Sequence, residues 1–333
     1  MEHKNALLTE KIGFGTAPLG NMFRDVPEEE AQATIEAAWD AGVRYYDTAP
    51  FYGAGLAELR LGKFLSKQNR DDYVLSTKVG RVIEDETEIK EGLFKEGLFT
   101  NGRTNKITTE YSAEATHTSI DQSMERLQTN RLDFVFVHDL SPDFLGDEWI
   151  AKFEEARTGA FLVLDDLKKQ GVIKGWGLGV NTTIPIELAL QLKEVHPTIN
   201  LQATQYTLLD HEDTLRRMMP EVEQSKSSIV VGAPYSSGAL LGGDYYNYGE
   251  VPSSVQTKIN KLTEVAESHG VSLKAAALQF SSAHPAVAAV IPGSTRPDRI
   301  NEDLEALRET IPEAFWQELI EKQLISAVAP LPL

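Results

Sequence analysis

The stretch Tyr73-Val74-Leu75-Ser76-Thr77-Lys78-Val79-Gly80 is rich in β-branched and aromatic residues and ends in a glycine, which is the pattern of a short β-strand entering a turn. Two neighbouring runs share this pattern. Val43–Thr48 carries Asp47 near its end, and Leu132–His138 ends in a histidine. Each of the three runs therefore places a titratable side chain where a predicted strand passes into a loop.

The same kind of run occurs eight times along the chain. The predicted strands are Lys11–Thr16, Val43–Thr48, Tyr73–Val79, Leu132–His138, Ile173–Val180, Leu201–Tyr206, Ile229–Ala233 and Val287–Ile291. Amphipathic stretches separate them, one of which opens at Pro27 and closes at Gly42, and the others cover roughly 55–67, 112–128, 148–170, 183–195, 212–226, 254–269 and 297–308.

Strands that alternate with helices predict a parallel sheet, and eight such units predict closure into an α/β fold of the (β/α)₈ TIM-barrel type. A further helix, about Pro312–Leu324, remains after the eighth unit. No linker or low-complexity tract divides the chain, so we expect residues 1–333 to form a single domain.

The composition excludes several classes of protein. The chain has 32 Lys and Arg against 50 Asp and Glu, a net charge of −18, which disfavours nucleic acid and anionic membranes as partners. The chain has 0 cysteines, which removes disulfides, thiolate catalysis and cysteine metal sites. No apolar run is long enough to span a membrane, and residues 1–5 lack a signal-peptide pattern. We expect a soluble cytoplasmic protein.

Two connections are longer than a minimal barrel requires. The first, Gly80–Tyr111, contains Gly92, Gly97 and Gly102, and the second, Tyr235–Pro252, contains a cluster of tyrosines between residues 245 and 248. Both follow predicted strands, so both lie on the carboxyl-terminal face where barrel enzymes carry their sites. The side chains at the ends of the second, third and fourth strands lie on that same face.

Asp47, Tyr52, Lys78 and His138 together suit proton transfer to or from a carbonyl or hydroxyl oxygen. A tyrosine is a poor acid or base at neutral pH, but a nearby ammonium favours the phenolate and lowers its pKa, and a carboxylate holds the ammonium in place. Singly, each residue also has a structural interpretation as a cap, a packed ring, a surface lysine or a core histidine. Those interpretations do not account for four titratable types at the ends of consecutive strands.

Other candidate motifs are weaker. Gly13-Phe14-Gly15 lacks the third glycine of a Rossmann fingerprint, because position 18 is Pro18, and a tight turn is the simpler interpretation. His211, His269 and His284 have no partners at metal-ligand spacing, so no metal site is expected. The tyrosines of 245–248 suit a lid on the barrel mouth or a stacking surface.

In order along nearly the whole chain, several motifs resemble the aldo-keto reductase superfamily. They are Gly13-Phe14-Gly15-Thr16, Tyr46-Asp47-Thr48-Ala49-x-x-Tyr52-Gly53, Ser76-Thr77-Lys78, the strand ending in His138, and Ile291-Pro292-Gly293-Ser294-Thr295. A narrower likeness is to the sugar-oxidising branch that includes aldose 1-dehydrogenases, pyridoxal 4-dehydrogenase and plant L-galactose dehydrogenases. That likeness is carried by residues 13–20, Tyr206-Thr207-Leu208-Leu209 and Ala275-Ala276-Ala277-Leu278-Gln279-Phe280.

The resemblance implies an NADP or NAD cofactor extended across the barrel mouth, with no metal. It implies that Tyr52 is the general acid/base, that Lys78 lowers its pKa, that Asp47 holds Lys78 and that His138 orients the substrate oxygen. By position it assigns cofactor contacts to Gly15, Thr16, Asp47, Asn181, Gln202, Tyr235, Ser237, Gly238, Leu240, Ser294, Arg296, Arg299, Glu302 and Asp303. Asn181 and Gln202 correspond to carboxamide contacts, although the glutamine of the family also aligns with Ala203.

The start of the predicted eighth helix bears on the choice between the two cofactors. Ser294, Arg296 and Arg299 lie where a helix amino terminus and arginine forks favour a 2′-phosphate. Many NADP-specific relatives have a lysine where this chain has Gly293, and an asparagine where it has Asp303. We therefore expect NADP to be slightly preferred, with use of both cofactors.

The resemblance to the sugar-oxidising branch implies oxidation of an aldose of the L-fucose, D-arabinose or L-galactose type at its anomeric carbon. A broad aldehyde or ketone reductase and a pyridoxal 4-dehydrogenase are alternatives within the superfamily. Two alternatives come from other classes: a barrel aldolase with Lys78 as a Schiff base, and a non-catalytic cofactor-sensing subunit. A small-molecule sugar or aldehyde is the expected partner, and the sequence leaves the oligomeric state open.

Overall fold

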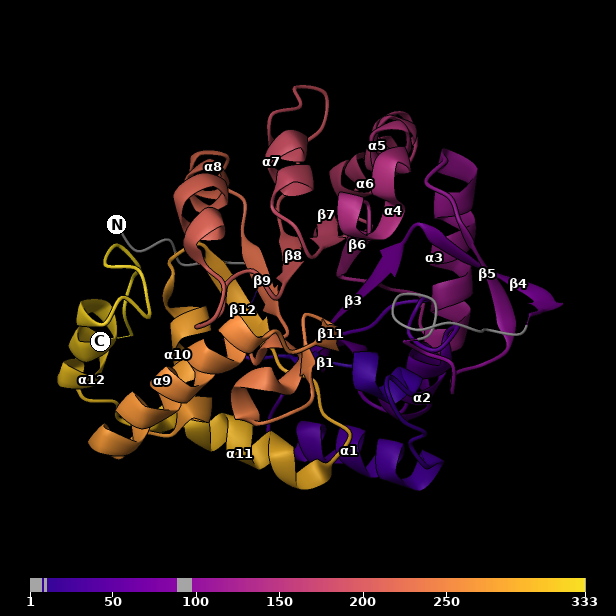
Figure 1. The fold of residues 1–333 in the computed structure, drawn as a ribbon. Helices are drawn as coiled ribbons and strands as arrows, with labels where there is room; N and C mark the ends of the chain where they lie inside the picture. Colours follow the sequence, from indigo (N-terminus) through magenta and orange to yellow (C-terminus); the bar gives the residue numbers. More distant parts are fainter. Residues whose placement is uncertain (1–7, 9–10, 89–97, 333) are drawn as a thin grey trace.

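The computed structural model of the chain describes Leu8, residues 11–88 and residues 98–332. Eight parallel strands form one sheet in the order β1-β2-β3-β6-β7-β8-β9-β12. Their bounds are β1 (Phe14–Gly15), β2 (Tyr45–Asp47), β3 (Val74–Val79), β6 (Phe134–His138), β7 (Gly175–Val180), β8 (Asn200–Ala203), β9 (Ile229–Gly232) and β12 (Val287–Ile291). Figure 1 shows these strands at the centre of the molecule with helices around them.

The sheet closes on itself where its first and last strands meet. Parallel bridges join Ile12 to Val290 and Gly15 to Gly293. The backbone N–H of Gly13 donates to Val290 O at 2.9 Å, and that of Gly15 donates to Pro292 O at 3.1 Å. The predicted (β/α)₈ barrel is therefore confirmed.

Gly13 and Gly15 belong to this closure, so the predicted tight turn is wrong. A Cβ on Gly13 would lie 2.6 Å from Tyr45 Cδ1 and 2.9 Å from Ile291 Cγ2, and a Cβ on Gly15 would lie 3.0 Å from Ile291 O. Any larger residue would push the first strand away from its neighbours. The two glycines are needed for close packing of extended backbone rather than for a turn.

The helices cover the outside of the barrel. They are α1 (Glu28–Asp40), α2 (Leu56–Leu65), α3 (Ala113–Leu127), α4 (Pro142–Leu145), α5 (Trp149–Thr158), α6 (Ala160–Lys169), α7 (Ile184–Leu190), α8 (Met219–Gln224), α9 (Ser253–His269), α10 (Leu273–Ala283), α11 (Pro297–Arg308) and α12 (Glu313–Glu321). Short 3-10 helices cover Ala17–Gly20, Arg70–Asp72, Gly146–Glu148 and Ser236–Leu241, and a π-helical turn covers Thr214–Met218.

Helical segments differ from the prediction at several places. The stretch predicted as one helix over 148–170 is two helices, α5 and α6, which meet at Gly159. A Cβ at Gly159 would lie 2.6 Å from Tyr111 O, so the break allows close contact with the start of α3. Another difference is α10, which the sequence analysis did not identify as a separate helix. Its start is capped by the Ser272 side chain, which accepts from Ala275 N at 3.4 Å.

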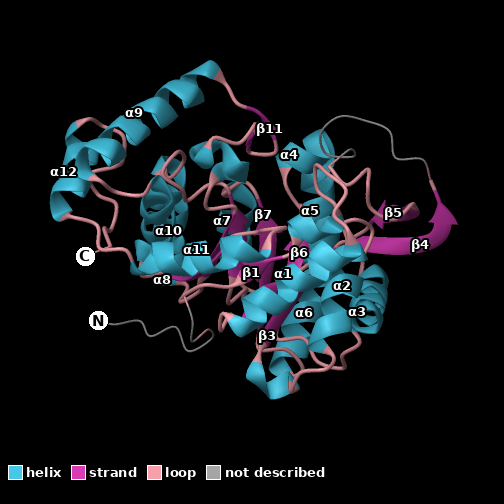
Figure 2. Ribbon diagram, turned by 90° about the horizontal axis from the view of Figure 1, so that it is seen from below, coloured by secondary structure: helices cyan, strands magenta, loops and turns pink. Residues whose placement is uncertain are grey.

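The predicted carboxyl-terminal helix is present as α12 and packs against α9 and α10. Phe315, Trp316 and Leu319 are buried, and the Trp316 ring stacks on Phe280 of α10 at 6.4 Å between centroids. His269, which ends α9, contacts Glu318 through Nε2 at 2.7 Å. Figure 2 shows α9 and α12 side by side at one side of the barrel.

Both long connections contain small antiparallel sheets that the sequence did not predict. The first holds a hairpin of β4 (Arg81–Thr87) and β5 (Asn105–Thr109), and the second holds β10 (Tyr245–Tyr246) and β11 (Gly249–Glu250). The hairpin of β4 and β5 lies on the opposite side of the barrel from α12 in both ribbon views (Figures 1 and 2). Gly92 and Gly97 lie outside the described residues.

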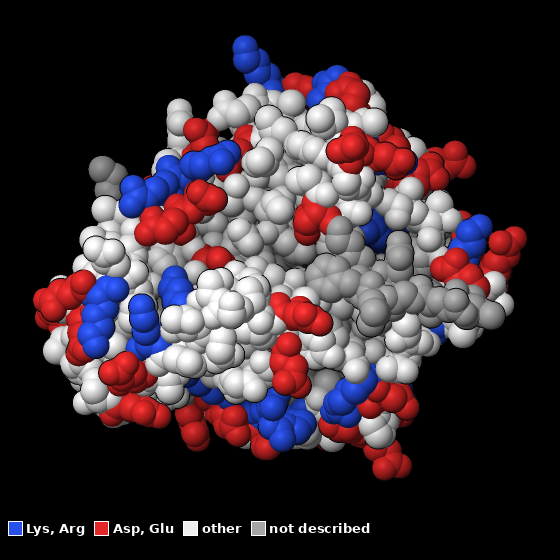
Figure 3. All heavy atoms as spheres, viewed as in Figure 1, with Lys and Arg blue, Asp and Glu red and all other residues white. Residues whose placement is uncertain are grey.

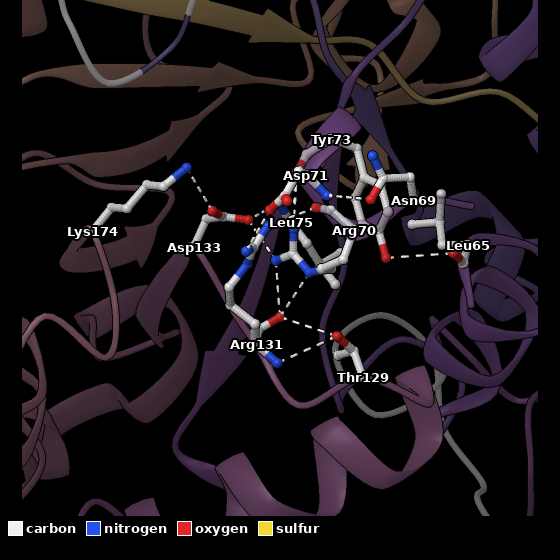
Figure 4. A network of polar contacts seen from close by, with 10 residues as sticks. All are labelled: Leu65, Asn69, Arg70, Asp71, Tyr73, Leu75, Thr129, Arg131, Asp133 and Lys174. Carbon is white, nitrogen blue, oxygen red and sulfur yellow. Dashed lines mark hydrogen bonds and ion pairs between the residues drawn. The ribbon is translucent and has the colours of Figure 1, made fainter. Parts of the chain in front are cut away.

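A buried carboxylate ties the amino-terminal ends of three strands together (Figure 4). Asp133, directly before β6, pairs with Arg70 at 2.5 Å and with Lys174 at 2.8 Å, and accepts from Leu75 N at 2.9 Å. Burial acts to raise the pKa of Asp133, but the bonds from Lys174, Arg70 and Leu75 outweigh it, and the net pKa lies below its usual range. This end of a barrel typically serves stability.

We expect Asp133→Asn to lower the free energy of unfolding by about 2 kcal/mol at neutral pH, because it removes the buried carboxylate that pairs with Arg70 and Lys174. The folded pKa of Asp133 is depressed, so its contribution is present above the unfolded pKa of about 3.9 and is lost as pH falls through the folded value. Urea unfolding at neutral and acid pH measures this. Asp71→Asn, at an exposed pair with Arg131, is the control. An equal loss at both pH values would contradict the assignment.

The surface is mixed in charge. On the face shown in Figure 3, Lys and Arg side chains lie among Asp and Glu side chains over the described residues. In the described part of the chain, no helix has the length and apolar composition needed to cross a membrane.

Candidate active site

Asp47 and Lys78 form an ion pair in the mouth of the barrel. Asp47 ends β2 and Lys78 lies near the end of the adjacent strand β3, and Nζ of Lys78 lies 2.6 Å from Asp47 Oδ2. Both side chains are only 1% exposed. Lys78 Nζ also donates to Thr48 O at 2.8 Å, and Ser76 Oγ donates to Asp47 Oδ1 at 2.6 Å. Burial raises the pKa of Asp47, although Lys78 and Ser76 act to lower it.

Tyr52 lies on the turn that follows β2, beside this pair. Nζ of Lys78 lies 4.6 Å from the centroid of the Tyr52 ring. The edge of His138, the last residue of β6, meets the same ring with 5.7 Å between centroids. The structure therefore brings together Asp47, Tyr52, Lys78 and His138, which the sequence places on three different strand ends.

The pKa of Tyr52 differs from the expectation. Burial raises it well above its ordinary value, and the carboxylates of Asp47 and Asp139 raise it further. A nearby Lys78 predicts a lowered pKa, but the Lys78 ammonium is already bound by Asp47 and Thr48 and faces the ring. Tyr52 is consequently a protonated phenol at neutral pH in this structure, ready to donate its proton.

His138 is neutral. Burial lowers its pKa well below the usual range, and the cations of Lys78 and Arg81 lower it further. Its Nδ1 is buried and has no hydrogen-bond partner among the described residues. A neutral imidazole can donate one hydrogen bond and accept another, which suits contact with a substrate oxygen.

A second ion pair, which the sequence analysis missed, lies behind His138. Arg81 Nη2 lies 3.1 Å from Asp139 Oδ2, and both side chains are buried. Tyr111 links this pair to the strand, because its hydroxyl donates to His138 O at 2.8 Å and accepts from Arg81 at 3.3 Å. One feature of the sequence could have indicated this ion pair: Asp139 directly follows His138.

Two hollows meet at Tyr52. A small cavity of about 50 Å³ is lined by Tyr52, Lys78 and His138 together with aromatic side chains of Phe51, Phe99 and Phe144. A much larger groove of about 700 Å³ is lined by Tyr52 and Asp47 at one end and by residues around the start of α11 at the other. Tyr52 contributes to both walls.

Most of the predicted cofactor contacts line the large groove. They are Gly15, Asp47, Tyr235, Ser237, Gly238, Ser294, Arg296, Arg299, Glu302 and Asp303. They come from β1, β2, the loop after β9, and the turn and helix after β12, which are far apart in sequence.

Four predicted contacts lie outside the walls of this groove. Thr16 is buried and donates to Asp47 O at 2.9 Å. Asn181 lines the small cavity, while Leu240 is only 2% exposed and packs in the core. Gln202 is fully buried, with its Oε1 accepting from Thr214 at 3.4 Å.

The alternation of side chains along β8 explains the position of Gln202. Leu201 and Ala203 face the barrel interior and line both hollows, and Gln202 between them faces outward. Of the two alignments left open for the glutamine of the family, only Ala203 places a side chain at the groove.

Several groove residues escaped the sequence analysis. They are Phe23, Arg24, Leu241 and Lys274. Phe23 and Tyr245 stack face to face, with 4.0 Å between centroids and 6° between planes. The tyrosines of 245–248 had suggested a lid, but no local sequence signal indicates Phe23 as the stacking partner.

The charges of the groove suit an anionic ligand. Arg24, Arg296 and Arg299 line it, and Arg24 donates to Thr295 at 2.6 Å. Lys274 pairs with Asp303 at 2.9 Å, and the Tyr235 hydroxyl donates to the same Asp303 oxygen at 2.6 Å, so this carboxylate has two partners within the protein.

The loop after β9 has a left-handed backbone. Ser236, Ser237 and Gly238 have φ angles of 50°, 59° and 100°. The N–H groups of Ser236 and Gly238 donate within the loop, to Ala233 O at 2.8 Å and to Tyr235 O at 3.0 Å. The groove volume, about 700 Å³, lies in the range of cofactor sites. The residues present therefore fit an extended dinucleotide along the groove, with an anionic group near the arginines at the start of α11.

A closed parallel barrel with its hollows and titratable groups at the carboxyl ends of the strands defines the class of (β/α)₈-barrel enzymes. Residues 11–323 match the Aldo/keto reductase family, and the chain belongs to this family. It is accordingly an NAD(P)-dependent oxidoreductase. In this structure Lys78 is buried and bound by Asp47 and Thr48, which offers no support for the Schiff-base alternative.

The chain is similar to characterised relatives over nearly its whole length. It is 33% identical to D-threo-aldose 1-dehydrogenase of a Pseudomonas species, covering 94% of each chain. It is also 33% identical to pyridoxal 4-dehydrogenase of Microbacterium luteolum, covering 97% of this chain and 96% of the relative. Its structure is similar to that of an aldo-keto reductase of Bacillus halodurans in its holo form, with a TM-score of 0.68, 26% identity and coverage of 96% and 93%.

Proposed function

We propose that this enzyme oxidises a cyclic aldose at its anomeric carbon to the lactone, with NADP slightly preferred over NAD. The observation that carries the proposal is the position of Tyr52, which lies on the wall between the small cavity and the large groove. A substrate carbon in the cavity would therefore lie next to both the Tyr52 phenol and the inner end of the groove. The similarity to D-threo-aldose 1-dehydrogenase supports the choice of substrate class.

The four residues then have distinct roles. Tyr52 exchanges a proton with the oxygen on the reacting carbon. His138 orients that oxygen, because its imidazole is neutral and its Nδ1 has no hydrogen-bond partner among the described residues. Lys78 stabilises negative charge as it develops on Tyr52, and Asp47 holds Lys78. The nicotinamide, when bound, accepts the hydride in oxidation and supplies it in reduction.

The end of the groove near the start of α11 supports the proposed preference for NADP over NAD. Arg296 and Arg299 line the groove at the start of α11, and both are exposed enough to reach an anion. Ser294 holds the turn before them, because its Oγ accepts from Arg296 N at 3.0 Å. Asp303 is engaged by Lys274 and Tyr235, which reduces its repulsion of a phosphate.

We expect Arg299→Ala to weaken NADP binding about tenfold or more while changing NAD binding little, because a hydrogen bond to a charged group contributes about 1.5–3 kcal/mol. Fluorescence titration of both cofactors measures the two dissociation constants. Arg308→Ala, in the last turn of α11, serves as the control for changes in helix charge. Equal losses for both cofactors would show that Arg299 contacts a part common to them.

A second substrate is favoured by a separate observation. The small cavity is walled by Phe51, Phe99 and Phe144, a surface that suits a flat aromatic ring. Together with the 33% identity to pyridoxal 4-dehydrogenase, this makes pyridoxal the alternative substrate.

The experiment that tests the proposal is a spectrophotometric screen of NAD and NADP reduction. L-fucose, D-arabinose and L-galactose are assayed beside their epimers, pyridoxal is assayed separately, and a simple aromatic aldehyde is assayed in the direction of reduction. We expect sharp differences in kcat/KM between epimers, because a site that binds a hydroxyl rejects its absence or misplacement strongly. Fast aldehyde reduction with no aldose oxidation would overturn the sugar assignment and indicate a broad aldehyde reductase.

A further inference from the structure

A third hollow lies against the small cavity. It has a volume of about 200 Å³ and shares Leu98, Phe144, Asn181 and Tyr248 with the small cavity. The other residues of its wall have polar side chains, although carbon atoms make up most of the lining surface: Thr182, Thr204, Gln205 and Asn247, together with Asp143. We call this hollow the polar chamber.

The positions of the hollows decide where a substrate extends. The small cavity, of about 50 Å³, lies at Tyr52, Lys78 and His138, and the polar chamber, of about 200 Å³, adjoins it. The large groove is needed for the cofactor. A substrate whose reacting carbon lies in the small cavity can therefore extend into the polar chamber.

The chemistry of the chamber wall fits hydroxyl groups. The hydroxyl oxygen of Thr182 and the amide oxygen of Asn247 are buried and have no hydrogen-bond partner among the described residues. A covered polar atom without a partner costs free energy unless a ligand or water satisfies it. On the same wall Asn181 Nδ2 donates to Asp143 Oδ2 at 3.1 Å, which fixes an amide and a carboxylate side by side.

We propose that the polar chamber is a subsite for the substrate hydroxyls that are remote from the reacting carbon. The proposal rests on the proposed function and extends it: the enzyme selects substrates with a polyhydroxylated body over short or apolar aldehydes. Thr182 and Asn247 donate to or accept from those hydroxyls, and Asp143 and Asn181 hold the wall.

Thr182→Val tests the proposal, because it removes the hydroxyl and keeps the shape. Valine leaves no unpaired oxygen, so the variant should unfold at the same temperature as the wild type or higher. We expect kcat/KM for the preferred aldose to fall about three- to tenfold, the range of one hydrogen bond, with no change for reduction of glycolaldehyde, which is too short to reach the chamber. The corresponding aldonolactone should also raise the unfolding temperature of the cofactor-saturated variant less than that of the wild type.

Thr198→Val is the matched control. The Thr198 hydroxyl is also buried without a partner among the described residues, but it lies at the opposite end of the barrel, before β8 and 2.7 Å from where a Cβ on Gly175 would be. This variant should keep wild-type kinetics with every substrate.

Different results would contradict the proposed subsite and the proposed function. Equal loss for the aldose and glycolaldehyde, or wild-type kinetics and lactone binding in Thr182→Val, would overturn the subsite and leave the proposed function in place. Failure of the wild type to reduce glycolaldehyde or oxidise any aldose would overturn the proposed function, and the subsite with it. A selective loss for the aldose, with weaker lactone binding, supports both.

Discussion

Tyr52→Phe should reduce turnover by about 10²–10⁴-fold, the usual effect of removing a general acid/base. The phenol is the group that lies between the small cavity and the groove. Burial lowers the pKa of His138, so its neutral imidazole is a weak acid at neutral pH. The ring itself remains, so its contacts with Lys78 and Phe99 are kept. Binding of the cofactor should change little.

The measurement is kcat in both directions together with the dissociation constant of NADP. Tyr73→Phe is the control, because the Tyr73 hydroxyl also donates a buried hydrogen bond, to Leu65 O at 3.4 Å, but lies before β3 at the other end of the barrel. Turnover within a few-fold of the wild type in Tyr52→Phe would exclude Tyr52 as the proton donor and direct attention to His138.

The direction of the pKa shift sets the pH dependence of the wild type. The pKa of Tyr52 is raised, so the phenol stays protonated through neutral pH and beyond the ordinary tyrosine value of about 10. Reduction, which needs the proton, should be independent of Tyr52 ionisation across this range. Oxidation needs the phenolate form of Tyr52 to take a proton, so it should become faster as pH rises and more of the phenolate forms. The dependence on pH should disappear in Tyr52→Phe.

The sequence predicted those parts of the molecule that depend on local patterns. Each of Asp47, Lys78 and His138 follows a buried run rich in β-branched or aromatic residues, and barrel topology sends the ends of such runs to one face. The register of β2 against β3 pairs Asp47 with Ser76, which brings Lys78, two residues further along β3, within reach of Asp47. Strand pattern and topology were sufficient for this site.

The cofactor groove was predicted less well, because it depends on single-residue register and on distant contacts. A shift of one residue on β8 decides whether Gln202 or Ala203 faces the groove, and the sequence allowed either. The pairing of Lys274 with Asp303 and the stacking of Phe23 on Tyr245 join elements far apart in the chain. Neither leaves a local pattern. The same holds for the raised pKa of Tyr52, which follows from burial rather than from neighbours in sequence.

The pair of Asp47 and Lys78 should be as important for stability as for catalysis. Lys78→Met removes the cation and leaves Asp47 fully covered, with Ser76 as its one remaining side-chain donor among the described residues. Breaking a buried pair in this way costs about 3–5 kcal/mol of unfolding free energy. Burial already raises the pKa of Asp47, and the variant should raise it further. A carboxyl whose pKa is higher in the folded state than in the unfolded state destabilises the protein as pH rises above the unfolded pKa, about 3.9 for aspartate. The loss of unfolding free energy in Lys78→Met should therefore be smaller at acid pH than at neutral pH.

A double-mutant cycle separates the pair from its surroundings. Asp47→Asn leaves Lys78 buried with Thr48 O as its acceptor, and the double variant Asp47→Asn with Lys78→Met leaves no buried charge at this position. Because each single variant leaves one uncompensated charge, the double variant should be less destabilised than the sum of the two, by about 1–3 kcal/mol. All three should lose turnover, because the cation beside Tyr52 is absent or no longer held. Additive losses would mean that Asp47 and Lys78 act independently, and the role of Asp47 as the residue that holds Lys78 would have to be given up.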